Sequence, residues 1–340
     1  MQATVIGAGV AGLTCALELA ERGVSVQVLE RAAALDGAGC SWFAGGMLAP
    51  WCEREASDPL IATLGVESLG WWRERFAGTV TRGTLVVAHA RDSAELGPFA
   101  RRTAHYQHVG GEQIAALEAD LSGRFAQGLY FPDEGHLDPR AALQALAARL
   151  RALGVPIRFG TEVGSATLDS ATPAGSLIDC TGLGARAHLP GLRGVKGEML
   201  LLRLPELSLS RPVRVLHPRT PLYVVPRGAG LFMVGATMIE SDEAAHISAR
   251  SMLELLSGAY ALHPAFGEAQ ILEIATGVRA AFADNLPRIS RVGEVLHVNG
   301  LYRHGFLLAP ALARRVADVL LHARHFPEVM HEDNRERRRA

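Results

Sequence analysis

The chain has 340 residues, of which 49% are hydrophobic and 20% charged, and its formal net charge is −1. This composition is typical of a globular protein with one large or two moderate domains, and it argues against a disordered chain and a nucleic-acid-binding protein. No apolar stretch is long enough to span a membrane and no basic leader precedes the first strand, so we expect a cytoplasmic protein.

The first elements in the chain form a predicted dinucleotide-binding unit. A short strand over Met1–Val5 leads into the glycine turn, a helical run covers Leu13–Ala20, and a second strand covers Val24–Leu29. In such a unit Gly7 allows a tight turn, Gly9 lets the backbone approach a pyrophosphate, and Gly12 lets the helix pack closely on the strand.

Glu30 completes this pattern eighteen residues after Gly12. A carboxylate at the end of the second strand can accept hydrogen bonds from ribose hydroxyls. The motif therefore predicts a bound nucleotide, and at this point leaves FAD and NAD both open.

The next part of the chain alternates helices and short strands. A glycine-rich loop runs to Pro50, and Asp138 is a predicted N-cap with Pro139 in the first helical position. We expect helices over Pro59–Phe76, Gln113–Asp120 and Arg140–Leu153, and strands over Thr84–Ala90, Gly128–Pro132, Pro156–Phe159 and Thr161–Val163.

The second half is mainly β. We expect strands over Ser176–Gly182, Glu198–Leu204, Arg214–His217, Leu222–Pro226, Leu231–Gly235, Gln270–Arg279 and Val295–Asn299, with helices over Ile247–Tyr260 and Pro310–Leu321. Two domains, each discontinuous in sequence, follow from this distribution. We expect a nucleotide-binding domain from 1–82, 136–192 and 283–330, a substrate domain from 83–135 and 193–282, and a flexible tail over 331–340.

Two later segments favour FAD over NAD. The strand that begins at Ser176 runs into small residues at the edge where α/β sheets bind ligands. The turn through Gly305 precedes the last helix, whose N-terminus favours negative charge. No second GxGxxG motif is present, so we expect no separate NAD domain.

Several longer segments carry a family resemblance. They are VIGAGVAGL, VLE, CSWFAGGMLAP, GHLDPR, DCTGLGAR, VKGEML, LYVVPRGAGLFMVGATM, TGVRAAFADNLPRI and GLYRHGFLLAP. Together they resemble the FAD-dependent amine oxidases of the D-amino-acid oxidase group, and most of all the glycine oxidases of bacterial thiamine biosynthesis. The resemblance runs from Thr4 to Leu321.

The resemblance implies an α/β fold, with a Rossmann-like FAD-binding domain of the glutathione-reductase type and a discontinuous antiparallel β + α substrate domain. The implied reaction is oxidative deamination of glycine or another small amino acid or amine by O2. It gives an imine, then glyoxylate or another 2-oxo acid, ammonia and hydrogen peroxide. A supply of imine to thiazole synthesis and a homo-oligomeric state are further implications.

Four residues match the family's substrate contacts. Arg279 would hold the carboxylate, since an arginine fork suits a carboxylate bidentately, and Tyr223 would help through its hydroxyl. Met238 would limit the space for a side chain, and Arg303 would give a second positive contact. The structural alternatives are an ion pair of Arg279 with Asp284, a packed Tyr223 ring and a Met238 in the core.

The cofactor contacts that the resemblance implies are spread along the chain. They are Gly7, Gly9, Val10, Ala11, Gly12, Glu30, Arg31, Ser41, Gly45, Gly46, Met47, Val163, Cys180, Thr181, Gly182, Arg303, His304, Gly305, Phe306, Leu307 and Leu308. For His304, an exposed position without a role is the alternative.

The cysteines and the single lysine are interpreted as residues without a reactive role. Relatives that bind flavin covalently use a cysteine late in the chain, and here the last one is Cys180, so we expect non-covalent FAD. The four cysteines lack metal-binding spacing, so we expect no metal, and Cys40 is interpreted as a small buried thiol. We expect Lys196, the only lysine, to form an ion pair and not to act in catalysis.

Trp42 and Phe43 replace smaller residues of the family, which leaves the substrate open between glycine, sarcosine and a D-amino acid. The sequence is also compatible with a dehydrogenase that passes electrons to a quinone or partner protein, as in hydrogen cyanide synthase. A flavin-binding subunit without turnover is the non-enzymatic possibility.

Overall fold

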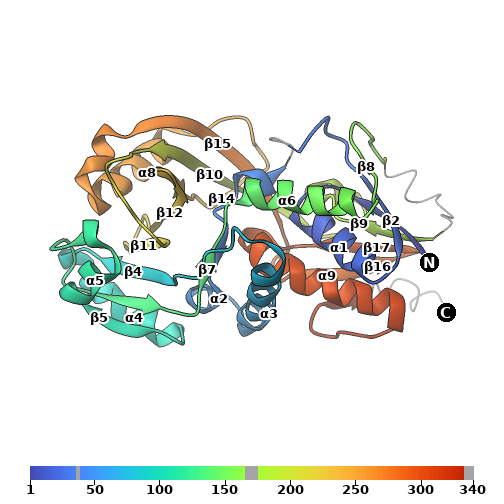
Figure 1. The fold of residues 1–340 in the computed structure, drawn as a ribbon, viewed down its shortest axis with the longest axis horizontal. Helices are drawn as coiled ribbons and strands as arrows, with labels where there is room; N and C mark the ends of the chain where they lie inside the picture. The colour runs from blue at the N-terminus through green and yellow to red at the C-terminus, as the bar shows by residue number, and fades with distance from the viewer. Residues whose placement is uncertain (36–38, 165–174, 333–340) are drawn as a thin grey trace.

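The structure is a computed structural model that describes residues 1–35, 39–164 and 175–332. Two large sheets organise these residues, and Figure 1 shows them in two lobes along the longest axis. The lobe that carries both termini contains the parallel strands, and the other contains the antiparallel ones.

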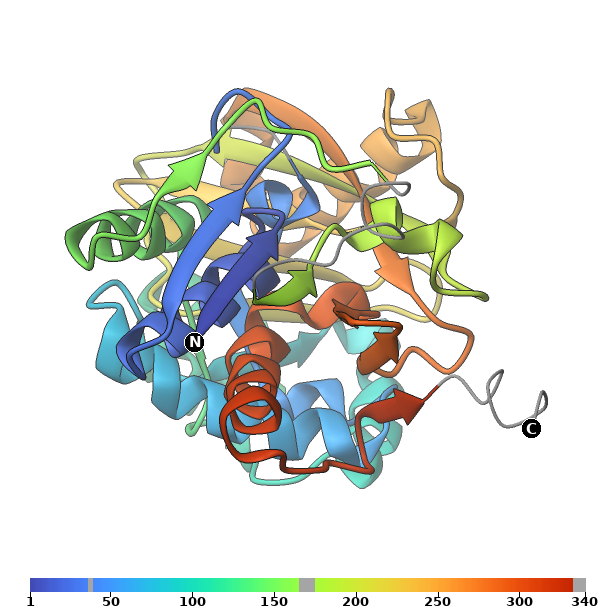
Figure 2. The same ribbon diagram turned by 90° about the vertical axis from the view of Figure 1, so that its right-hand side faces the viewer.

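The first sheet has seven strands in the order β18-β16-β17-β9-β1-β2-β8. Their bounds are β1 (Gln2–Ile6), β2 (Ser25–Leu29), β8 (Ile157–Arg158), β9 (Ser176–Asp179), β16 (Arg288–Val292), β17 (Val295–Asn299) and β18 (Met330–Glu332). Neighbours are parallel from β17 to β8, whereas β16 runs antiparallel to β17. Figure 2 shows this sheet nearest the viewer.

Helices with apolar faces share one apolar core with this sheet. They are α1 (Val10–Glu21), α3 (Pro59–Arg75), α6 (Pro139–Ala152) and α9 (Gly305–His322). α1 buries Leu13 and Leu17 completely against this core. The predicted start of α6 is confirmed, because the Asp138 carboxylate accepts hydrogen bonds from the backbone N–H groups of Arg140 and Ala141 and Pro139 opens the helix.

The second sheet has nine strands and a separate apolar core. The strands are β4 (Thr84–Ala88), β5 (Gln107–Gly110), β6 (Gln127–Phe131), β10 (Arg193–Arg203), β11 (Val213–Leu216), β12 (Leu222–Gly228), β13 (Leu231–Gly235), β14 (Ile239–Glu240) and β15 (Gln270–Ala281). Apart from the parallel pair β4–β11 they are antiparallel. The helices of this lobe are α4 (Leu96–Arg102), α5 (Gly111–Leu117) and α8 (Ala249–Leu262).

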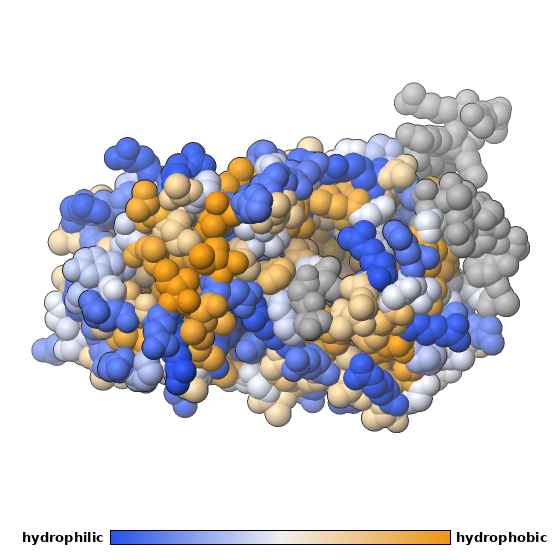
Figure 3. Space-filling view, turned by 90° about the horizontal axis from the view of Figure 1, so that it is seen from above, coloured by the Kyte–Doolittle hydropathy of each residue, from blue (hydrophilic) through white to orange (hydrophobic). Residues whose placement is uncertain are grey.

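β10 and β15 form a long antiparallel ribbon in which Val195 lies opposite Arg279 and Gly197 opposite Gly277. Among the described strands β15 pairs only with β10, so it is an edge strand. It exposes Ile271, Leu272 and Ile274 to solvent. Viewed from above, the antiparallel lobe carries an apolar patch between polar areas (Figure 3).

Short elements connect the two lobes. β3 (Met47–Leu48) pairs with β7 (Gly135–His136), and α2 (Pro50–Glu53) follows β3 directly. The 3-10 turns η1 (Cys40–Phe43) and η6 (Tyr302–His304) lie next to β15. The remaining 3-10 turns are η2 (Ala90–Glu95), η3 (Ala119–Leu121), η4 (Gly182–Ala187) and η5 (Pro264–Glu268).

Some predicted elements are wrong. Residues 161–163 form no strand, and β16 and β18 were not predicted. The expected tail over 331–340 begins too early, because His331 belongs to β18, and residues 333–340 lie outside the described ranges.

The last helix starts at Gly305, five residues before the expected Pro310. Proline has no N–H to donate to the carbonyl four residues earlier, which leaves the Phe306 oxygen without its helical partner. The indole N–H of Trp72 donates to that oxygen at 2.8 Å, so α9 accommodates the proline.

Candidate active site

The glycine turn after β1 allows very close backbone contacts. Gly7 has φ +97°, and a Cβ on it would lie 2.8 Å from the Cys180 carbonyl oxygen. A Cβ on Gly12 would collide with the Gly7 carbonyl. Both positions therefore require glycine, and they bring the start of α1 against the end of β9.

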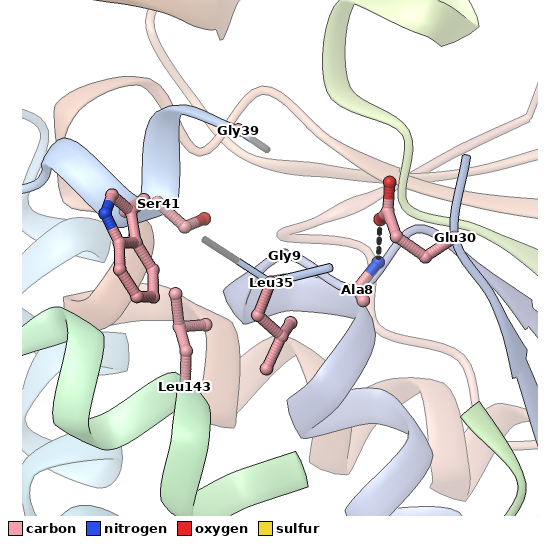
Figure 4. A pocket seen from close by; sticks show the side chains of 8 residues that line it. Ala8, Gly9, Glu30, Leu35, Gly39, Ser41 and Leu143 are labelled. Carbon is pink, nitrogen blue, oxygen red and sulfur yellow. Dashed lines mark hydrogen bonds between the residues drawn. The ribbon is translucent and has the colours of Figure 1, made fainter. Parts of the chain in front are cut away.

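A cavity with about 300 Å³ of empty space, part of it open to solvent, lies beside this turn. It is lined by Ala8, Gly9, Glu30, Leu35, Gly39, Ser41, Trp42 and Leu143 (Figure 4). The Glu30 carboxylate accepts a hydrogen bond of 2.6 Å from the Ala8 N–H and one of 2.9 Å from the Ala32 N–H. Each carboxylate oxygen has a further lone pair, so Glu30 can still accept hydrogen bonds from hydroxyl groups.

A second cavity, with about 580 Å³ of empty space that is partly open to solvent, lies between the two lobes. Its lining consists of Val10, Cys40, Ser41, Phe43, Ala44, Gly45, Gly197, Met199, Tyr223, Ala236, Gly277, Arg279, Tyr302, Arg303, Gly305 and Phe306. Ser41 lines both cavities, and its hydroxyl oxygen accepts from the Val10 N–H at 3.2 Å. The two cavities therefore adjoin at the N-terminus of α1.

Arg279 reaches the second cavity from β15. Its Nη1 donates to the Thr237 carbonyl at 3.1 Å, and a Cβ on Gly197 would come within 2.5 Å of the guanidinium, so that glycine provides its space. The alternative ion pair with Asp284 is wrong, because Asp284 pairs with Arg288 at 2.8 Å. Within the described chain no carboxylate forms an ion pair with Arg279, which leaves this cation able to bind an anion.

Tyr223 also lines the second cavity, from β12. Its ring lies against Gly45 and Gly235, since a Cβ on either glycine would meet ring atoms at 3.1 to 3.3 Å. Burial raises the pKa of the Tyr223 phenol, although Arg279 opposes this shift. The hydroxyl is therefore protonated at neutral pH and can donate a hydrogen bond.

Met238 is 52% exposed, so its interpretation as a core residue is wrong. Its sulfur accepts from the Tyr302 hydroxyl at 3.3 Å and from Arg303 Nη1 at 3.6 Å. Met238 thus lies beside Arg303 and Tyr302, at the edge of the cavity and not among its lining residues.

Arg303 lines the cavity but already has a carboxylate partner. Its Nη2 lies 2.8 Å from Glu53 Oε2, and Glu53 Oε1 lies 3.0 Å from Arg214 Nη1. Burial raises the pKa of Glu53, but the guanidinium groups of Arg303 and Arg214 outweigh it and hold the pKa at about 2. Glu53 is therefore ionised at neutral pH.

His304 is buried, and the alternative of an exposed histidine is wrong. Its Nε2 lies 3.2 Å from the Ser57 hydroxyl and its Nδ1 lies 3.5 Å from Glu53. Burial lowers the pKa of His304 to about 3, despite the opposing charge of Glu53. The imidazole is therefore neutral and belongs to the polar network behind the cavity.

Arg227 holds the loop that follows η1. Its Nη1 donates to the Leu137 carbonyl at 2.5 Å, and its Nη2 donates to the carbonyls of Ala44 and Gly45 at 3.1 and 2.9 Å. Burial lowers the pKa of Arg227 to about 10, which leaves it charged at neutral pH. Sequence reasoning missed Arg227, Glu53 and Arg214.

The other predicted cofactor residues lie around the glycine turn and the loop. Gly46 and Met47 follow the loop, with Gly46 packed on the Leu137 carbonyl and Met47 packed on the same small apolar cluster as Phe43 and Tyr223. Ala11 is in the first turn of α1 and Arg31 is exposed. Phe306, Leu307 and Leu308 are buried in the first turn of α9.

The turn after β9 is tightly held. The Thr181 N–H donates to Asp179 at 2.9 Å, and the Asn299 side chain donates to the Gly182 carbonyl at 2.8 Å. Cys180 is buried against the glycine turn. Val163, partly buried, packs on the core of the first sheet without belonging to a strand.

Two further expectations concern Cys40 and Lys196. Cys40 is exposed and lines the second cavity, so its interpretation as a buried thiol is wrong. Lys196 is buried and forms ion pairs with Glu243 at 2.7 Å and Glu198 at 3.3 Å.

The two cavities fit the two ends of FAD. The glycines that line or border the first cavity leave room for a pyrophosphate at the N-terminus of α1, and Glu30 can accept from ribose hydroxyls. The loop held by Arg227 would lie along the ring system, next to Arg279 and Tyr223. In the described ranges no His, Cys, Asp and Glu side chains gather as a metal site, and no helix has the length and apolarity of a membrane span.

Comparison with known proteins covers nearly the whole chain. The DAO family, described as FAD dependent oxidoreductase, matches residues 2–319. A Rhizobium etli protein provisionally named thiamine biosynthesis oxidoreductase ThiO is 54% identical over 329 residues, which are 96% of this chain and 99% of the relative.

Solved structures share the fold. The glycine oxidase of Geobacillus kaustophilus has a TM-score of 0.78 at 24% identity, over 98% of this chain and 96% of that one. The iminodiacetate oxidase of Chelativorans sp. BNC1 has a TM-score of 0.78 at 22% identity, over 96% of each chain. The predicted fold class is thereby confirmed, and so is the family resemblance. The chain belongs to the DAO family of FAD dependent oxidoreductases, and it is an enzyme whose cofactor is FAD.

Proposed function

We propose that the enzyme oxidises the amine of glycine or another small amino acid, with O2 as electron acceptor. The products are an imine, which water converts to glyoxylate or another 2-oxo acid and ammonia, and hydrogen peroxide. The observation that supports this most directly is Arg279, a cation without a carboxylate partner in the described chain, in the cavity that adjoins the nucleotide turn.

Two side chains would bind and orient the substrate. Arg279 would bind the carboxylate, and the protonated Tyr223 hydroxyl would donate a second hydrogen bond to it. FAD, when bound, supplies the hydride acceptor and passes the electrons to oxygen. A substrate with a fixed carboxylate presents its Cα at a defined place, so orientation and not acid–base catalysis is the contribution of this chain.

The cavity favours a small substrate. Phe43, Met199 and Tyr223 occupy its lining together with the glycines, and Met238 lies at its edge beside Arg303. This arrangement supports glycine or sarcosine ahead of larger amino acids.

We extend the proposal to the setting of the reaction. The similarity to the Rhizobium etli protein supports a role in thiamine biosynthesis, with the imine as the product that a thiazole-forming step consumes. The two sheets would belong to the FAD-binding and substrate domains, with the boundaries expected from the sequence except that β18 extends the first sheet to Glu332. A cytoplasmic, homo-oligomeric enzyme with non-covalent FAD completes the proposal.

A substrate panel tests the proposed function. Glycine, sarcosine, D-alanine and D-proline are added anaerobically to the holoenzyme, and loss of flavin absorbance is followed before air and a peroxide assay. We expect the fastest bleaching with glycine or sarcosine, and one peroxide per substrate. Bleaching without peroxide would indicate a dehydrogenase, and no bleaching by any of the four would refute the proposal.

A further inference from the structure

The two arginines that line the second cavity differ in their partners. Arg303 forms an ion pair with Glu53, with 2.8 Å between Nη2 and Oε2. Arg279 instead donates hydrogen bonds to the backbone carbonyls of Thr237 and Lys196. Glu53 is itself 6% exposed and shared with Arg214. An incoming carboxylate therefore finds one arginine free of a carboxylate and one already bound to an internal carboxylate.

Breaking the ion pair between Glu53 and Arg303 costs free energy. If a ligand carboxylate displaced it, Glu53 would remain buried and ionised with Arg214 as its single close guanidinium, and a buried charge that loses a partner is strongly destabilising. If the ligand carboxylate instead shared Arg303, it would lie close to the negative charge of Glu53 in a site of low dielectric. Both routes penalise a second carboxylate on the ligand.

We propose that Glu53 is a specificity-determining residue, which occupies Arg303 and thereby restricts the cavity to ligands with a single carboxylate. Accepted ligands would have a single carboxylate, which Arg279 would bind; glycine and sarcosine are ligands of this kind. Excluded ligands would carry a second one within reach of Arg303, as iminodiacetate, aminomalonate and D-aspartate do. The inference rests on the proposed function in one respect, that Arg279 binds the substrate carboxylate.

Binding of simple carboxylates tests this without turnover. The wild-type holoenzyme is titrated with acetate and with malonate, and each dissociation constant is taken from the shift of the FAD absorption spectrum. We expect malonate to bind at least tenfold more weakly than acetate. Malonate that binds as tightly as acetate, or more tightly, would overturn the proposal.

Variants of Glu53 locate the effect. Glu53→Gln removes the charge that occupies Arg303, so the ratio of the malonate to the acetate dissociation constant is expected to fall about tenfold. Glu53→Asp keeps the charge and should keep the wild-type ratio. The matched control is Glu134→Gln, because Glu134 is buried beside α2, where it accepts from the N–H groups of Trp51 and Cys52, yet forms no ion pair with Arg303.

The outcomes separate the two proposals. A folded, FAD-loaded Glu53→Gln protein with the wild-type ratio refutes the role of Glu53. If Glu53→Gln does not fold, the ratios of the two dissociation constants in wild type and in Glu53→Asp still test the role of Glu53. If no amino acid is oxidised but the ratios of the dissociation constants are those expected, the proposed reaction is refuted while the inference about Glu53 is supported.

Discussion

The substitution Gly197→Ala moves the Arg279 guanidinium without removing it. Gly197 lies on β10 opposite Gly277, and an added Cβ would come within 2.5 Å of the guanidinium. The nearest guanidinium atom would lie 2.2 Å from that Cβ, whereas ordinary contact is about 3.5 Å, so the group has to move by roughly 1.3 Å. The strand can stay in place, because the colliding atoms are the end of a flexible side chain.

This movement of the guanidinium should weaken its hydrogen bonds to the substrate carboxylate. A hydrogen bond to a charged group contributes about 1.5–3 kcal/mol, and each 1.4 kcal/mol is about tenfold in binding. We therefore expect kcat/KM for glycine to fall by about 10- to 100-fold, with most of the change in KM. Peroxide formation over a range of glycine concentrations measures it, and the FAD to protein ratio should be unchanged.

Gly194→Ala is the matched control on the same strand. Its Cβ would meet Val278 Cγ1 at 2.7 Å and a flexible charged group, the Asp242 carboxylate, which pairs with exposed Arg186 away from the cavity; neither contact involves the Arg279 guanidinium. We expect kcat/KM to stay near the wild-type value. The reasoning is refuted if Gly197→Ala keeps kcat/KM within a factor of two of wild type, or if both variants lose equally.

Three further predictions concern the network around the site. Arg227→Met leaves three backbone carbonyls without their donor, so we expect a loss of about 3 kcal/mol in the free energy of unfolding; a urea-measured loss below about 1 kcal/mol would contradict this. Glu30→Ala should weaken FAD binding to the apoprotein by about 10- to 100-fold, and an unchanged dissociation constant would speak against a ribose contact. Burial raises the pKa of Glu134 to about 7 from 4.5, so between these pH values the folded state binds more protons than the unfolded state and stability falls as pH rises. From pH 5 to 8 the free energy of unfolding of wild type should fall by about 2 kcal/mol relative to that of Glu134→Gln. If the two proteins differ in stability by the same amount at both pH values, the shift is disproved.

Local sequence rules were sufficient for the nucleotide turn and for several helix starts. Gly7 has the positive φ of a tight turn and Gly12 packs on the Gly7 carbonyl, both within one strand–turn–helix unit, and Asp138 caps a helix that begins with the next residue. Such features depend on neighbours in the chain. The family segments then supplied Arg279 and Tyr223, which the structure brings to one cavity.

Features that depend on distant partners escaped prediction. The early start of α9 depends on an indole N–H of Trp72, 234 residues away from Phe306 in sequence. Glu53 and Arg214 look like ordinary surface charges in the sequence, and only the fold buries Glu53 and pairs it with the partly buried Arg214. β16, with the sequence RISRV, lacks the apolar character of a central strand and is recognised only through its pairing with β17 and β18.

Anaerobic stopped-flow mixing of glycine with the wild-type and Arg279→Ala holoenzymes tests the central claim most directly. The account predicts rapid, saturable loss of flavin absorbance in wild type. In the variant, with the same FAD content, the glycine concentration for half the maximal rate should rise by about 100-fold, the loss of two charge-assisted hydrogen bonds. A wild-type flavin that glycine leaves unchanged, or an identical concentration dependence in the two proteins, would contradict it.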